Sequence, residues 1–139
     1  MRCLVYSINY FPNKDALILS TISSIWKEAL EKLKKENDII SALDGVYSVI
    51  MAVDSDYSGF LSTHAALLKG KTEGRDEMNE VIDRIKDYLY SALDNDIKEK
   101  IKNNMKEDEF LSFLMANIIL SVMKREEPKV LKKLILKFL

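Results

Sequence analysis

Apolar residues recur at three- and four-residue steps along most of the chain, and this spacing predicts amphipathic helices. The helices predicted in this way span 13–37, 60–70, 75–93, 94–105, 107–125 and 128–139. Residues suited to helix N-termini precede several of them, and the candidate caps are Asn13 or Asp15, Asn37 or Asp38, and Asp94 or Asp96. Pro128 suits the first turn of the last helix, and Trp26 is expected in the core.

Two segments carry the signal of a β-strand instead. Residues 2–10 alternate, so that Leu4, Tyr6, Ile8 and Tyr10 fall on one face. Residues 39–53 are ambiguous, because their apolar spacing fits a helix while 46–53 is rich in strand-forming residues and follows Gly45. Helix is favoured here, and a strand over 46–53 is the alternative that would pair with the N-terminal one. The expected fold is a mainly α single globular domain over 1–139, a five- to six-helix bundle with a short N-terminal strand.

Composition limits the function classes. The chain has 139 residues, 47% of them apolar, and its net charge of -1 gives no global basic field of the kind that drives non-specific nucleic-acid binding. Its longest apolar run, 110–123, is shorter than the roughly 20 residues of a membrane span and is interrupted by polar side chains. Cys3 is the only cysteine, which suits a reducing cytoplasm. The absence of Gln beside plentiful Lys and Glu is compatible with a thermophile or with an AT-rich genome.

One stretch, "DSDYSGFLSTHA" over 54–65, begins like a calcium-binding loop. Asp54, Asp56 and Ser58 hold the first three ligand positions and Gly59 the sixth, but Ala65 stands where a bidentate Glu is needed. The sequence therefore favours a turn capped by these polar residues, and a weak single calcium module is the alternative.

The sequence contains no complete enzyme motif among those considered. Residues 65–72 differ from a phosphate-binding loop only in having Ala65 for the first glycine, but the preceding residues look helical rather than strand-like. His64 is the only histidine, so neither a His-Cys metal cluster nor a Ser-His-Asp set can be assembled from it and its neighbours. We expect no enzymatic activity and no cofactor.

The last segment, "PKVLKKLILKFL", is the most informative about function. Its apolar stripe comprises Leu131, Leu134, Ile135 and Phe138, and lysines spread over the remaining surface. Such a helix serves as a core helix, as a docking helix for a partner protein or a second copy, or as a binder of an anionic surface. The preferred hypothesis is a non-catalytic cytosolic subunit or adaptor that acts through protein contacts. Its predicted interface comprises Tyr6, Ile8, Leu131, Leu134, Ile135 and Phe138.

A nucleic-acid-associated accessory subunit of a ribonucleoprotein or DNA-processing complex is the alternative hypothesis. Small helical subunits of RNA-guided defence complexes have this size and class, although no residue motif links the chain to them. The contacts it predicts to nucleic acid are Lys69, Lys71, Arg75, Lys129, Lys132 and Lys133.

Overall fold

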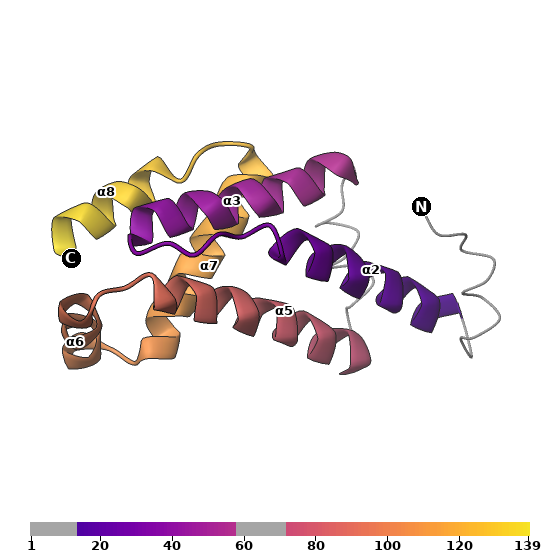
Figure 1. Ribbon diagram of the computed structural model, residues 1–139, viewed down its shortest axis with the longest axis horizontal. Coiled ribbons are helices and arrows are strands. Elements are labelled where there is room, and N and C mark those ends of the chain that lie inside the picture. The colour runs from indigo at the N-terminus through magenta and orange to yellow at the C-terminus, as the bar shows by residue number, and fades with distance from the viewer. Residues whose placement is uncertain (1–13, 58–71) are drawn as a thin grey trace.

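Six helices account for most of the chain that the structure, a computed structural model, describes, namely residues 14–57 and 72–139 (Figure 1). In chain order they are α2 (Lys14–Leu30), α3 (Ile39–Asp56), α5 (Thr72–Ser91), α6 (Asn95–Asn104), α7 (Glu107–Lys124) and α8 (Lys129–Phe138). The expectation of a mainly α fold is confirmed. The predicted strand over 2–10 and the predicted helix over 60–70 lie outside the described residues.

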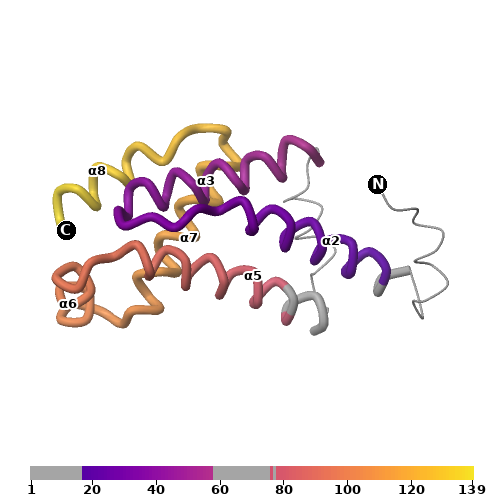
Figure 2. Tube along the Cα trace, viewed as in Figure 1, coloured from indigo at the N-terminus to yellow at the C-terminus, as the bar shows by residue number. Residues whose placement is uncertain are grey.

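Four of these helices, α2, α3, α5 and α7, pack against one another around the core. The chain runs along α2, turns back along α3, and α7 crosses behind this layer (Figure 2). The short helices α6 and α8 both lie toward the end of the bundle where α5 finishes and α3 begins, α8 on the α3 side and α6 beyond the end of α5. The largest fully buried side chains come from all four core helices and are Trp26, Leu43, Val46, Ile50, Ile85, Leu89, Leu114, Ile118 and Val122.

The alternative of a strand over 46–53 is wrong, because these residues form the second half of α3. Val46, Ile50 and Val53 are all buried, and their spacing places them on one side of a helix but on both faces of a strand. The helix begins where the sequence indicated: Asp38 is its N-cap, and the Asp38 carboxylate accepts a hydrogen bond from the Ser41 backbone N–H at 3.1 Å. Burial of one helical stripe thus outweighs the strand propensity of the individual residues.

The helix predicted over 13–37 is shorter in the structure, since α2 ends at Leu30 and residues 33–36 have no regular secondary structure. Asp15 lies inside α2 and is not its cap, while Asn13 lies outside the described residues. Leu33 still packs against the core from the non-helical segment, and this imitates one more helical turn in the apolar pattern. The apolar spacing therefore overestimates the length of this helix.

This connection is fixed by a contact with α5. The Tyr88 hydroxyl donates a hydrogen bond to the Lys34 carbonyl at 2.5 Å, and Gly45 of α3 faces the same place. Burial, and then the negative charge of Glu36, raise the pKa of the Tyr88 phenol, so the hydroxyl keeps its donor proton at neutral pH. The glycine that made the sequence ambiguous therefore sits where α3, α5 and the connection meet.

The α7–α8 connection contains Arg125, the only non-glycine residue with positive φ in the described part of the chain, at φ 55 and ψ 39. The Arg125 N–H donates to the Val122 carbonyl and the Glu126 N–H to the Ser121 carbonyl, which is the hydrogen-bond pattern of a Schellman motif. Glycine is the usual residue at this position. Here the Arg125 guanidinium instead reaches the Asp54 carboxylate of α3, with Nη2 at 3.4 Å from Oδ2.

Gly45→Ala is expected to raise the free energy of unfolding by about 0.5–1 kcal/mol, because alanine favours the helix interior over glycine. An added Cβ would lie 3.5 Å from the Tyr88 hydroxyl oxygen and 3.7 Å from Leu33 Cδ2, which is ordinary contact. Chemical denaturation measures the change. Gly45→Leu is the matched control and should destabilise, since its larger side chain would displace Tyr88. A destabilising Gly45→Ala would show that this contact is tighter than described.

At the α7–α8 connection, Arg125→Gly should unfold with a free energy about 1 kcal/mol higher than Arg125→Ala. Both variants lose the guanidinium, so the difference reports only the backbone preference for the left-handed conformation. Thermal and urea unfolding of the two variants give the comparison. Equal stabilities would mean that residue 125 does not hold a positive φ in solution.

Candidate functional site

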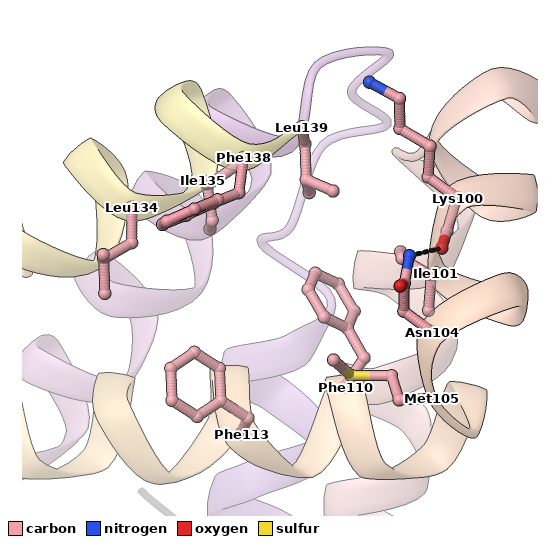
Figure 3. Close-up of a pocket in the computed structure, with 10 residues that line it drawn as sticks. All are labelled: Lys100, Ile101, Asn104, Met105, Phe110, Phe113, Leu134, Ile135, Phe138 and Leu139. Carbon is pink, nitrogen blue, oxygen red and sulfur yellow. Dashed lines mark hydrogen bonds between the residues drawn. The ribbon is translucent and has the colours of Figure 1, made fainter.

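A mainly apolar hollow lies where α8 faces α6 and the start of α7 (Figure 3). We call it the α6–α8 groove, and it has a volume of ≈ 570 Å³. Its lining residues are Lys100, Ile101, Asn104, Met105, Phe110, Phe113, Leu134, Ile135, Phe138 and Leu139. Leu134, Phe138 and Leu139 come from the α8 side and face the two phenylalanines of α7, while Ile101 and Met105 close one side.

The two edges of the apolar stripe on α8 have different roles. Leu131 and Ile135 are 3% and 5% exposed and belong to the core. Leu134 and Phe138 lie further around the helix and are 40% and 68% exposed, so they border the groove. Lys132 forms an ion pair with Asp44 of α3 and so fixes α8 on a third side. The helix is therefore anchored by one edge while its neighbouring edge remains open.

Phe110 and Phe113 of α7 provide the opposite wall, and the start of α7 is well fixed. The Glu109 carboxylate accepts a hydrogen bond from the Lys106 backbone N–H at 3.0 Å, which satisfies a free donor at the helix N-terminus. The Lys86 ammonium of α5 lies 2.9 Å from the Asp108 carboxylate and from the Ser112 hydroxyl. Phe110 is 8% exposed whereas Phe113 is 48% exposed. This wall of the groove is therefore held in place by contacts with α5, and its outer aromatic ring, Phe113, is accessible.

The third wall is α6, a short helix whose N-cap is Asp94 as the sequence suggested, with Ile97 N–H donating to its carboxylate at 2.8 Å. Ile101 is buried and anchors it to the core. One N–H of the Asn104 side-chain amide donates to the Lys100 carbonyl at 2.8 Å, so this group is oriented by its own helix. Lys100 is the only charged residue in the lining. No set of polar groups converges on the interior, which is the feature that orients a small polar ligand in most binding pockets.

Two segments that border the groove are rich in lysine. Residues 97–106 contain four lysines and one glutamate, and residues 129–139 contain four lysines and no acidic residue, although the whole chain has a net charge of -1. Two of these lysines have partners, since Lys132 pairs with Asp44 and the Lys98 ammonium lies 4.4 Å from the Tyr90 ring centroid. The other six form no ion pair with the residues that the structure describes. Positive charge is therefore concentrated at this end of the bundle.

The acidic residues nearest to the groove offset part of this charge. Asp108 and Asp44 are paired with Lys86 and Lys132, whereas Glu109 accepts only a backbone N–H and keeps its negative charge. Partial burial, and then the neighbouring Glu107 carboxylate, raise the pKa of the Tyr90 phenol, which places Glu107 at Tyr90. An acidic ligand would therefore find lysines available at the rim of the groove.

The predicted nucleic-acid contacts are not brought together by the part of the fold that is described. Lys129, Lys132 and Lys133 lie on α8, whereas Lys69 and Lys71 lie outside the described residues. Arg75 belongs to the first turn of α5, about 24 Å along that helix from its last residue, Ser91, beside which α6 begins. Arg75 and the α8 lysines therefore lie toward opposite ends of the bundle.

The predicted calcium ligands begin in a helix rather than in a loop. Asp54 and Asp56 lie in the last turn of α3, and Ser58 lies outside the described residues. Two positions apart on a helix, the two carboxylates point about 200° apart around its axis. Asp54 is buried and bound by Arg125, whereas Asp56 is exposed. Within residues 14–57 and 72–139, no three His, Cys, Asp or Glu side chains are grouped so as to hold a metal ion.

The other half of the predicted interface, Tyr6 and Ile8, lies outside the described residues, as do Cys3 and His64. A second hollow of ≈ 590 Å³ follows the α7–α8 connection, where Lys124, Glu126 and Glu127 give it a mixed charged lining. None of the helices in the described part of the chain is long and apolar enough to cross a membrane. The chain matches no known family model, no curated protein and no solved structure.

Sequence reasoning found the α8 residues of the groove but missed Met105, Phe110 and Phe113. Their helices were predicted, yet an apolar residue next to a buried stripe gives no sign of whether it faces the core or a hollow. It also missed the lysines of α6, although their alternation over 98–102 was visible in the sequence. The sequence signal that could have indicated this lysine-rich surface was the pair of short basic segments that follow Asp94 and Pro128.

Three leucines of α8 offer a matched test of how this helix is docked. Leu131→Ala should cost about 2–5 kcal/mol of unfolding free energy, as for a buried leucine. Leu136→Ala should change the free energy of unfolding by no more than about 0.5 kcal/mol, apart from the difference in helix propensity, since Leu136 is 71% exposed. Leu134→Ala should fall between them. Equal effects at all three positions, measured by urea denaturation, would contradict one-sided docking.

Proposed function

We propose that this protein is a non-catalytic subunit or adaptor that acts by binding another protein at the α6–α8 groove. The observation that carries the proposal is the open edge of α8: Leu134 and Phe138 face Phe113 across an apolar hollow, although the same helix is fixed to the core by Leu131. Exposed apolar surface of this kind, rimmed by charged residues, marks interaction sites in proteins.

The composition of the groove supports a protein partner. Aromatic and methionine side chains are enriched at the centres of protein interfaces, and Met105, Phe113 and Phe138 are 46%, 48% and 68% exposed here. The lysines around them provide a charged rim, which contributes to the rate and selectivity of association. A cytoplasmic location belongs to the same proposal, because a single cysteine suits a reducing compartment.

A nucleic-acid-associated accessory subunit is the second candidate, and the basic segments 97–106 and 129–139 favour it. Phosphate groups would satisfy these lysines as well as carboxylates would. The two candidates differ in what they require of Leu134 and Phe138, since a contact dominated by the phosphate backbone depends on charge rather than on these side chains.

Capture from an extract of the native host tests the first candidate. Tagged wild-type protein and the variants Leu134→Ser, Phe138→Ser and Leu136→Ser are compared, with bound proteins quantified by mass spectrometry after nuclease treatment. Leu136 is as exposed as Phe138 but does not line the groove, so Leu136→Ser is the control. We expect a protein that the wild type and Leu136→Ser retain and that Leu134→Ser and Phe138→Ser lose by about tenfold or more.

Circular dichroism and thermal unfolding establish that each variant is folded. A captured protein that all four forms retain equally would show that the groove is not its binding site. Loss of capture on nuclease treatment alone, with the variants indistinguishable, would favour the nucleic-acid candidate.

A further inference from the structure

We infer that the α6–α8 groove takes an acidic amphipathic helix, one whose apolar face fills the hollow and whose Asp and Glu residues meet the surrounding lysines. This inference rests on the proposed function and specifies the partner's chemistry. It follows from three features of the groove: its mostly apolar lining, the arrangement of its walls, and its local charge.

The interior favours an apolar helix face over a small polar ligand. Figure 3 shows aromatic and aliphatic side chains on opposing sides of the hollow, and the Asn104 amide is bonded to its own helix at the Lys100 carbonyl. The Lys100 ammonium extends away from Phe110 and Phe113 in this view. A ligand in the interior therefore meets contacts that are shape-dependent and hydrophobic rather than directional.

The walls have the spacing that accepts a helix. Leu134 and Phe138 are four residues apart on α8, Ile101 and Met105 are four apart at the end of α6, and Phe110 and Phe113 are three apart on α7. Rows of side chains at three- and four-residue steps form the ridges between which the ridges of another helix pack. Recognition of an amphipathic helix in a groove between helices uses this geometry, with anchors at positions i, i+3, i+4 and i+7 of the ligand.

The charge of the rim selects an acidic helix and disfavours a second copy of the chain. The segments 97–106 and 129–139 together carry eight lysines against one glutamate, and the first turn of α7 adds three acidic residues, of which Asp108 pairs with Lys86. Lysine is therefore in excess, and two copies meeting through this surface would bring like charges together, which disfavours that contact. Carboxylates placed on the flanks of a bound helix would instead complete ion pairs with lysines such as Lys100 and Lys137.

Nucleic acid would complement the lysines of the groove but not its apolar interior. Phosphates complement the lysines, but Leu134, Met105 and Leu139 would gain little from a sugar–phosphate backbone. Burying this apolar surface is most favourable when a complementary apolar face covers it. The combination of an aliphatic interior and a lysine rim therefore favours a peptide ligand.

Two designed helical peptides of about 18 residues, roughly 27 Å in length, provide the test. Both have Leu at positions i, i+3, i+4, i+7 and i+11; one carries Glu and Ala at its remaining positions, and the other carries Lys and Ala. Binding to the full-length protein is followed by fluorescence anisotropy at about 50 and 500 mM salt, where screening differs strongly. We expect the Glu peptide to bind at least tenfold more tightly than the Lys peptide at low salt, with the difference shrinking at high salt.

Four variants assign the binding to this groove. Phe138→Ser should weaken the Glu peptide by about tenfold or more, whereas Leu136→Ser should leave it unchanged. Lys137→Glu should weaken the Glu peptide and strengthen the Lys peptide, while Lys27→Glu, which makes the same charge change on α2 outside the groove, should alter neither by more than about twofold.

The inference is overturned if both peptides bind equally, if Phe138→Ser has no effect, or if a mixed-sequence single-stranded RNA binds while the Glu peptide does not. Failure here is distinguishable from failure of the proposed function. If host capture still depends on Phe138 when the Glu peptide does not bind, only the acidic-helix chemistry is wrong. If capture does not depend on Phe138, the groove itself is not the interface.

Discussion

The burial of Leu131 and Ile135 against the helical core is the contact on which the surface at this end of the molecule depends. An isolated ten-residue helix is marginal in water, so α8 (Lys129–Phe138) owes its structure to this docking. Only one edge of its apolar stripe is used. Because the Lys132–Asp44 pair holds α8 on the α3 side, Leu134 and Phe138 are directed to the other side, where the α6–α8 groove begins.

Helix α7 is likewise buried on one side only. The longest apolar run of the sequence, 110–123, lies in α7, and one side of this helix supplies Leu114, Ile118 and Val122 to the core. However, Phe113, Leu120 and Met123 are each about half exposed or more on the surface of the described part. A helix that is apolar nearly all round has core contacts on one side and apolar surface left over on another. In this protein part of that apolar surface faces α8 and forms the opposite wall of the α6–α8 groove.

Most of the helices could be predicted because each has a periodic apolar stripe, and α3 and α6 also begin at a capping residue. Asp38 and Asp94 are caps in the structure, Pro128 precedes α8 by one residue, and residues 46–53 follow the helical period rather than their strand propensity. The end of α2 could not be predicted, because Leu33 reaches the core from a non-helical segment. The left-handed conformation of Arg125 could not be predicted either, since its backbone is set by the Schellman motif and its side chain contacts Asp54, which is distant in the sequence.

The groove was predictable only on the α8 side, because periodicity shows which residues share a face but not which faces meet a neighbour. The distinction between Leu131 and Leu134 is the central one, and thiol labelling tests it most directly. In a Cys3→Ser background, cysteine is introduced singly for Leu131, Leu134, Ile135 or Phe138, and reaction with a maleimide is timed under native and denaturing conditions. The account predicts that cysteines at 134 and 138 react within about tenfold of their denatured rates, while those at 131 and 135 are protected to the extent set by unfolding. Uniformly fast labelling would mean that α8 is not docked, and uniformly slow labelling would mean that the groove is closed; either result would contradict the account.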